Sequence, residues 1–155
     1  MGDRLDMKLT DAEARQLLEM LKRSLEKELA TPKAGEKRVF EVEGDTERDR
    51  FKIQIFRGKI DPDKVSYAAL ISKDGTYLLG LDLDDSKKHF DPVTEKVVYG
   101  SHWHIYTEEF DRRHAFPATD ITSKDFVENT IKFLEKFHVI EKPDIIPETI
   151  MLENF

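Results

Sequence analysis

Cysteine is absent from this 155-residue chain, which excludes disulfide bonds and thiolate metal sites. Long apolar runs are also lacking, because no stretch approaches the ~20 apolar residues that a membrane-spanning helix requires. Residues 1–7 do not contain the apolar centre of a secretory signal. We therefore expect a cytoplasmic protein that does not enter a membrane.

Net positive charge is lacking as well, since the chain has 25 basic and 32 acidic residues and its formal net charge is −7. This balance disfavours non-specific binding to nucleic acid, which normally uses a basic face. Two short basic pairs, Lys87-Lys88 and Arg112-Arg113, are most simply solvated loop charges. An acidic protein can nevertheless present a local positive pocket to an anionic ligand.

The length fits a single domain over residues 1–155. We expect 1–9 and 144–155 to be flexible or peripheral segments. Thr10 to Glu13 match a capping box and predict the start of a helix. Its apolar stripe continues to Leu29, so we expect the helix to end by Pro32. A second capping box, Thr122 to Asp125, predicts a helix that ends near His138.

Between the two predicted helices, apolar and polar residues alternate as they do in half-buried strands. The predicted strands cover 38–43, 50–57, 66–71, 77–84 and a fifth segment from Val97 or Val98 to Phe110, while 85–96 form an exposed connection and 115–118 a short strand or extended piece. The chain is thus predicted to have an α+β fold. It consists of an N-terminal helix, an antiparallel meander of about five strands and a C-terminal helix, with both helices packed on one face of the sheet.

The predicted fifth strand carries two of the five histidines and the only tryptophan. Because side chains alternate along a strand, His102, His104 and Tyr106 share one face, while Trp103 takes the core face. If this strand pairs with 77–84 in antiparallel fashion, Asp82 and Asp84 lie beside the two histidines.

Five motifs stand out along the chain: 51–60, Leu81-Asp82, His89-Phe90-Asp91-Pro92, His102 to Glu108, and Arg113 to Pro117. They resemble the motifs of a family of small uncharacterised bacterial and phage proteins, described only as a domain of unknown function. In that family an arginine usually precedes the leucine-aspartate pair at 81–82 and an asparagine usually stands at position 91, whereas this chain has Gly80 and Asp91. The resemblance implies a prokaryotic or phage, cytoplasmic setting and a mobile-element context, without an established activity.

Four interpretations of the histidines stay open. His89, His102 and His104, with the carboxylates of Asp82, Asp84 and Asp91, suit a divalent metal that activates water. Without a metal, His102 and His104 can act as general acid and base while Arg57 or Arg113 holds an anionic substrate. The same sheet face can also bind a protein or small ligand. Finally, the histidines can be structural residues of a half-buried sheet whose hydrogen bonds are satisfied by neighbouring side chains.

Our leading prediction is a small acidic binding or regulatory protein of mobile-element or phage origin, which uses the sheet face around His102 and His104 and requires no cofactor. The alternative is a metal-dependent hydrolase of phosphoester or nucleic-acid type, with zinc or manganese held by Asp82, His89, His102 and His104. The sequence leaves enzymatic activity, the partner and the oligomeric state undetermined. The candidate ligand-binding residues are His89, His102, His104, Tyr106, Arg57, Arg113 and His114.

Overall fold

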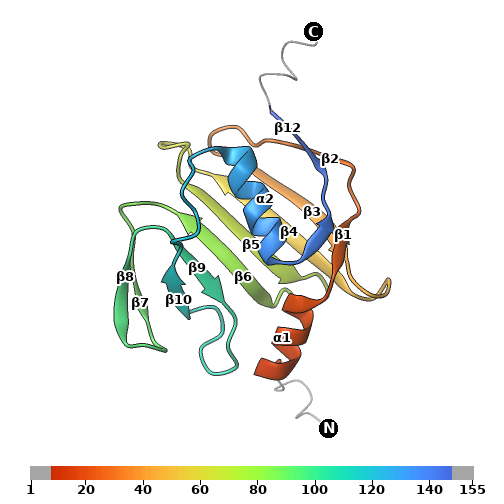
Figure 1. Cartoon of the computed structure of the whole chain (residues 1–155), viewed down its shortest axis with the longest axis horizontal. Helices are drawn as coiled ribbons and strands as arrows, with labels where there is room; N and C mark the ends of the chain where they lie inside the picture. The colour runs from red at the N-terminus through yellow and green to blue at the C-terminus, as the bar shows by residue number, and fades with distance from the viewer. Residues whose placement is uncertain (1–7, 148–155) are drawn as a thin grey trace.

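An eight-stranded mixed sheet occupies the centre of the protein, and the computed structural model describes residues 8–147 (Figure 1). The strand order is β10-β9-β6-β5-β4-β3-β1-β11, and two further pairs, β2 with β12 and β7 with β8, form separate two-stranded sheets. The elements are α1 (Asp11–Glu19), β1 (Lys22–Ser24), β2 (Glu28–Ala30), β3 (Lys37–Glu43), β4 (Arg50–Arg57), β5 (Val65–Ile71), β6 (Tyr77–Leu83), β7 (Lys88–Asp91), β8 (Lys96–Tyr99), β9 (His102–Ile105), β10 (Ala115–Pro117), α2 (Phe126–Lys136), β11 (Val139–Glu141) and β12 (Asp144–Ile146).

The predicted α+β class and the antiparallel meander from β3 to β6 are confirmed. Phe51, Ile53 and Ile55 of β4 are fully buried, as the alternating pattern requires for one face of a strand. Strand β6 also pairs directly with the strand that carries the tryptophan, β9, in the predicted antiparallel sense. These pairings position the face on which the histidines lie.

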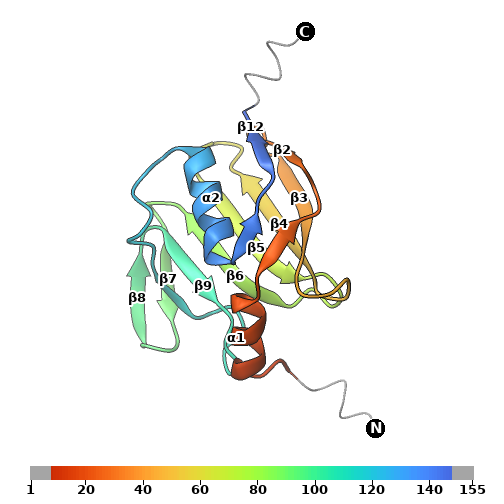
Figure 2. The ribbon, with the colours of Figure 1, turned by 45° about the vertical axis from the view of Figure 1, so that its right-hand side comes forward.

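Helix α2 covers one face of the sheet, and Phe133 stacks on Tyr67 and Trp103 with ring centroids 5.2 and 6.1 Å apart. Its N-cap is Asp125, whose carboxylate accepts from the Glu128 amide; the prediction of Thr122 as the cap was wrong. Figure 2 shows α1 beside one end of the strands, while α2 lies across them. The prediction that both helices pack across one face is therefore correct only for α2.

The N-terminal helix is shorter than its apolar stripe predicted. It has the predicted capping box at Thr10 but ends at Glu19, and the chain then forms β1 and β2. The Lys22 ammonium is buried and donates to the carbonyls of Leu18, Met20 and Phe137. Strand β1 pairs in parallel with β11, which makes the sheet mixed instead of purely antiparallel. Tertiary pairing with a distant segment here overrides helical periodicity.

The stretch predicted as one connection and one long strand is divided differently. Residues 88–99 form the β7–β8 hairpin, and the chain turns at Gly100, where φ is +80°. Glycine has no side chain to oppose this left-handed conformation. Strand β9 begins afterwards at His102, so the predicted continuous strand from Val97 to Phe110 was wrong. The predicted short strand near 115–118 is present as β10.

The terminal segments are described only in part. Residues 144–146, predicted as peripheral, form β12, which pairs in parallel with β2. The expectations for 1–7 and for the apolar segment 150–152 fall outside the described residues. Among the helices in 8–147, none is long and apolar enough to cross a membrane.

Candidate metal centre

Three histidines from two structural elements converge on the sheet face opposite α2. His102 and His104 belong to β9, where they stand across from Asp82 and Gly80 of β6. Trp103 between them faces the core and is fully buried, so the two histidines must point the other way. His89 comes from β7 of the hairpin. One ring nitrogen of each histidine lies within 4.8 Å of those of the other two.

The side chains of this cluster are close enough to share one small ion or proton. The Nε2 atoms of His102 and His104 are 3.1 Å apart. Oδ2 of Asp82 lies 3.1 Å from Nε2 of His104 and 3.5 Å from Nε2 of His102. The ring of His89 stacks on that of His102 and meets that of His104 edge-on, at centroid distances of 5.5 and 4.9 Å.

Backbone carbonyls determine which nitrogen of each ring carries hydrogen. Nδ1 of His102 lies 2.8 Å from the Gly100 carbonyl, and Nδ1 of His104 lies 2.9 Å from the Arg112 carbonyl. A carbonyl oxygen can only accept, so both Nδ1 atoms are the protonated ones. In the neutral rings the two Nε2 atoms therefore point lone pairs at each other and at the Asp82 carboxylate.

His89 is oriented in the same way but with its nitrogens exchanged. Its Nε2 donates to the Arg113 carbonyl at 2.9 Å, which leaves Nδ1 with the lone pair. Each of the three imidazoles thus has one N–H held by a backbone carbonyl, while its other nitrogen has no backbone partner. Histidines that bind metals usually donate the N–H of their other ring nitrogen to a carbonyl, carboxylate or water in this way. The lone pairs without a donor between them need either a proton or a cation.

Electrostatics around Asp82 favour positive charge in the cluster. Burial by itself would raise the pKa of Asp82, but hydrogen bonds with His102, His104 and Ser66 outweigh it and hold that pKa well below its usual range. Burial would lower the pKa of His102, yet the hydrogen bond to Asp82 is among the effects that raise it above its ordinary value. Asp82 is therefore a carboxylate at neutral pH, and its negative charge can compensate that of a bound cation.

His114 and Asp91, two further residues of the predicted motifs, form a separate pair beside the cluster. The Asp91 carboxylate is buried and accepts from Nδ1 of His114, the Ala115 amide and the Thr94 hydroxyl. Burial by itself would raise the pKa of Asp91, but these hydrogen bonds outweigh it and hold that pKa far below its usual range. The pair fastens the β7–β8 hairpin to β10 and thereby holds His89 in place.

Two other candidates lie away from the histidines. The Tyr106 hydroxyl donates to the Leu9 carbonyl at 2.6 Å, and the side chain is buried, so it is not part of an open binding face. Arg57 extends on the α2 side of the sheet and lies over the Phe126 ring, 4.4 Å from its centroid. Arg113, in contrast, lines the same cavity as His89 and His104.

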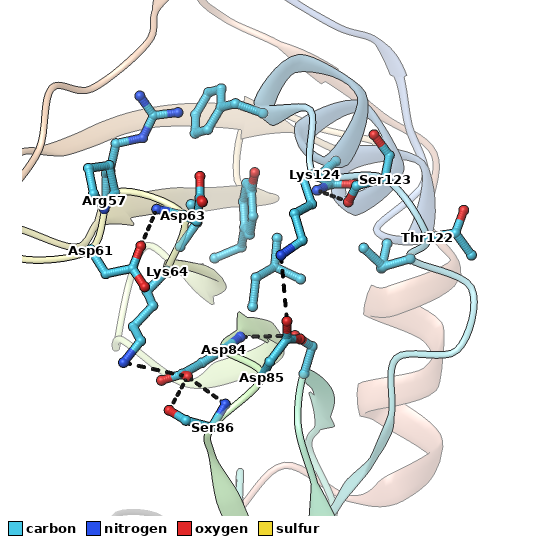
Figure 3. Close-up of a pocket in the computed structure, with 18 residues that line it drawn as sticks. Arg57, Asp61, Asp63, Lys64, Asp84, Asp85, Ser86, Thr122, Ser123 and Lys124 are labelled. Carbon is cyan, nitrogen blue, oxygen red and sulfur yellow. Dashed lines mark hydrogen bonds and ion pairs between the residues drawn. The ribbon is translucent and has the colours of Figure 1, made fainter.

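Arg57 and Asp84 line a second cavity of about 450 Å³ that contains none of the histidines (Figure 3). Asp84 was predicted to lie beside the histidines, but it accepts from Ser86 and lies 3.7 Å from the Lys64 ammonium. Figure 3 shows acidic and basic side chains interleaved around this cavity. The sheet separates it from the histidine cluster.

Sequence patterns missed the backbone carbonyls of Gly100, Arg112 and Arg113, because a carbonyl contact depends on loop conformation and not on residue type. They also missed Tyr77. Its ring lies over Gly80, where an added Cβ would come within 1.5 Å of the Tyr77 hydroxyl. The departure from the arginine expected at position 80 was the available signal, because a glycine inside a strand often marks close packing by another group.

Fold and site together define an α+β protein with a histidine-rich candidate metal centre on the open face of a mixed sheet. The chain belongs to a family of unknown function (DUF6978), which it matches over residues 9–139. Searches among curated proteins and among solved structures found no match.

Proposed function

We propose that this protein is a metal-dependent hydrolase in which His89, His102, His104 and Asp82 bind one divalent ion, zinc or manganese. The observation that carries the proposal is the orientation of the three rings. Each has one N–H bonded to a backbone carbonyl, and one ring nitrogen of each histidine lies within 4.8 Å of those of the other two. Nitrogen with carboxylate oxygen suits these ions, and the absence of cysteine excludes thiolate ligands.

Distances within the cluster fit coordination by one ion. Zinc–nitrogen bonds of about 2.0–2.1 Å in a tetrahedron place neighbouring ligand atoms about 3.3 Å apart. The separations of 3.1, 3.1 and 3.5 Å among the two Nε2 atoms and Oδ2 of Asp82 bracket that value. For these three atoms, small movements of the side chains are therefore enough to bind an ion; the ligand nitrogen of His89 lies within 4.8 Å of the other two ring nitrogens.

The position of the centre supports hydrolysis over a purely structural role. Asp82, His89 and His104 line a cavity of about 480 Å³, so the cluster has access to water and to a small substrate. A bound divalent ion lowers the pKa of a coordinated water and polarises the bond under attack. Asp82 is partly exposed to this cavity and is held as the carboxylate, which makes it able to accept a hydrogen bond from that water.

Metal analysis of the purified protein tests the proposal. We expect about one equivalent of zinc or manganese per chain after incubation and desalting, and its loss in the variant His102→Ala/His104→Ala. The matched control is His138→Asn, which replaces a histidine outside the cluster by a residue that tolerates its positive φ of 61°. Wild-type protein that folds normally but retains no metal would contradict the proposal.

A binding or regulatory function is the second candidate, and one surface favours it. Phe90, Val97 and Tyr99 of the β7–β8 hairpin expose 56%, 44% and 70% of their surface. Clustered exposed apolar side chains often mark interaction sites. His102 and His104 are buried, so a protein partner would contact this hairpin and not the histidines themselves. If the wild type and the variant Phe90→Ser/Tyr99→Ser capture the same proteins from a lysate of the native host, this candidate is excluded.

The cytoplasmic location and the prokaryotic or phage origin stay predictions from the sequence.

A further inference from the structure

The cavity in front of the histidines is positively charged, although the whole chain carries a net charge of −7. Its charged lining consists of Lys37, Arg112 and Arg113 against a single carboxylate, that of Asp82. The floor is the open sheet face, including Gln54 and Ser66. An ion at the cluster would neutralise Asp82, so the three cations would then have no counter-charge in the cavity wall.

Among the described residues, one of these cations has a hydrogen bond within the protein, from Nε of Arg113 to the Phe110 carbonyl at 3.3 Å. Within residues 8–147, no carboxylate lies at ion-pair distance from Lys37, Arg112 or Arg113. The guanidinium of Arg112 lies over the Tyr77 ring, 5.1 Å from its centroid, and that of Arg113 lies 5.4 Å from the Phe110 centroid. Stacking leaves the edge of the Arg112 guanidinium available as a hydrogen-bond donor, and the two terminal amino groups of Arg113 are available as well.

The two arginines are also tied to the histidine cluster through their backbone. The Arg112 carbonyl accepts from His104 and the Arg113 carbonyl accepts from His89. The same two residues therefore orient the imidazoles and place two cationic side chains at the edge of the cavity. A ligand that touched an ion at the cluster would lie beside these side chains.

Tyr77 adds a neutral donor to the same wall. Its hydroxyl occupies the space that a side chain at Gly80 would fill, and its ring meets that of His104 edge-on. Burial is the main reason that the pKa of Tyr77 is raised, so the hydroxyl keeps its proton at neutral pH. In the described part of the chain, no protein atom forms a hydrogen bond with this hydroxyl. It is therefore free to donate to an anion.

We propose that the substrate of this centre is a small phosphate monoester, bound with its phosphate between the metal and the side chains of Lys37, Arg112 and Arg113. This inference rests on the metal-dependent hydrolase proposed above. The dianionic terminal phosphate of a monoester matches several unpaired cations better than the single charge of a diester, and guanidinium groups pair well with phosphate oxygens. A volume of about 480 Å³ accommodates a phosphate with a small organic group.

The reaction consumes one water and needs no other reactant. Water oxygen forms a new bond to phosphorus while the ester P–O bond breaks. The leaving oxygen takes up a proton and departs as an alcohol, and inorganic phosphate remains. The cations stabilise the charge that develops on the phosphoryl oxygens.

The test uses the metal-loaded full chain with inorganic phosphate and two chromogenic esters, 4-nitrophenyl phosphate and bis(4-nitrophenyl) phosphate. The variant Arg112→Gln/Arg113→Gln removes both guanidinium groups but keeps the backbone carbonyls that orient His104 and His89. The control Arg15→Gln/Arg48→Gln removes the same charge from exposed positions away from the cavity. Metal content and circular dichroism establish that each variant is folded and loaded.

We expect the wild type and the control to bind phosphate equally and to hydrolyse the monoester in preference to the diester. The arginine variant should retain its metal but bind phosphate about tenfold more weakly for each charge-assisted contact that is lost. A loaded wild type that does not bind phosphate, an arginine variant that binds it as tightly, or preferential turnover of the diester would overturn this inference while leaving the metal site intact. Failure of the wild type to take up metal would instead overturn the proposed function.

Discussion

Zinc added to the metal-free protein should raise its thermal midpoint by about 5–10 °C. Binding to the folded state alone stabilises it by about 2.7 kcal/mol when free metal is 100 times the dissociation constant. For a domain of this size each kcal/mol corresponds to about 2–4 °C. Binding to the folded state is favoured because the two Nε2 atoms, 3.1 Å apart, are only about 0.2 Å from the separation in a tetrahedral zinc site.

Differential scanning fluorimetry with increasing zinc or manganese measures this shift directly. His104→Ala should abolish it, because His104 supplies one ligand nitrogen and lies closest to Asp82. His138→Asn should leave it unchanged, since His138 contacts the Leu18 carbonyl outside the cluster. The shift should also weaken as the pH falls, because protons compete with the metal for the imidazoles.

Equal midpoint shifts in the wild type and in His104→Ala would refute the reasoning, because the metal would then bind elsewhere. The absence of any shift with either ion, in protein shown to be folded, would equally refute it. In that case one shared proton, and not a metal, would satisfy the lone pairs of His102, His104 and Asp82.

Three further predictions concern the surrounding fold. Burial lowers the pKa of Lys22 to about 7, so the unfolded chain binds more protons than the folded one between about pH 7 and 10. The free energy of unfolding should therefore rise with pH across that range, by at most about 1.4 kcal/mol per pH unit. Urea titrations measure this rise, and Lys22→Met should lack it. Gly80→Ala should destabilise the protein because its Cβ would collide with the Tyr77 hydroxyl, and a double-mutant cycle with Tyr77→Ala should give a coupling of about 0.5–3 kcal/mol. Asp91→Ala should lower the free energy of unfolding, measured by chemical denaturation, by about 2–4 kcal/mol and should weaken metal binding. The substitution leaves buried hydrogen-bond donors unpaired and removes the contacts that hold the β7–β8 hairpin. Unaltered stability would contradict this role of Asp91.

Much of the central sheet follows from the sequence, because alternation of apolar and polar residues directly reports which side of a strand is buried. The strands β3 to β6 and the β6–β9 pairing were predictable for this reason. The N-terminal helix was extended too far because Leu21 and Leu25 continue its apolar spacing, yet both are exposed after the helix ends. Only the distant pairing of β1 with β11 accounts for that end, and local periodicity carries no information about it.

For the candidate site, the sequence by itself determined that His102 and His104 share one face of a strand, with Asp82 on its antiparallel neighbour. A repeat of two residues and a short connection are sufficient for that inference. Only the tertiary structure decided that the hairpin brings His89 to the same point and that three backbone carbonyls orient the rings. It likewise separated Arg57 from Arg113 by placing them on opposite faces of the sheet. Ring orientation and the charge of a cavity depend on loops that meet in space, and residue spacing along one strand does not encode such meetings.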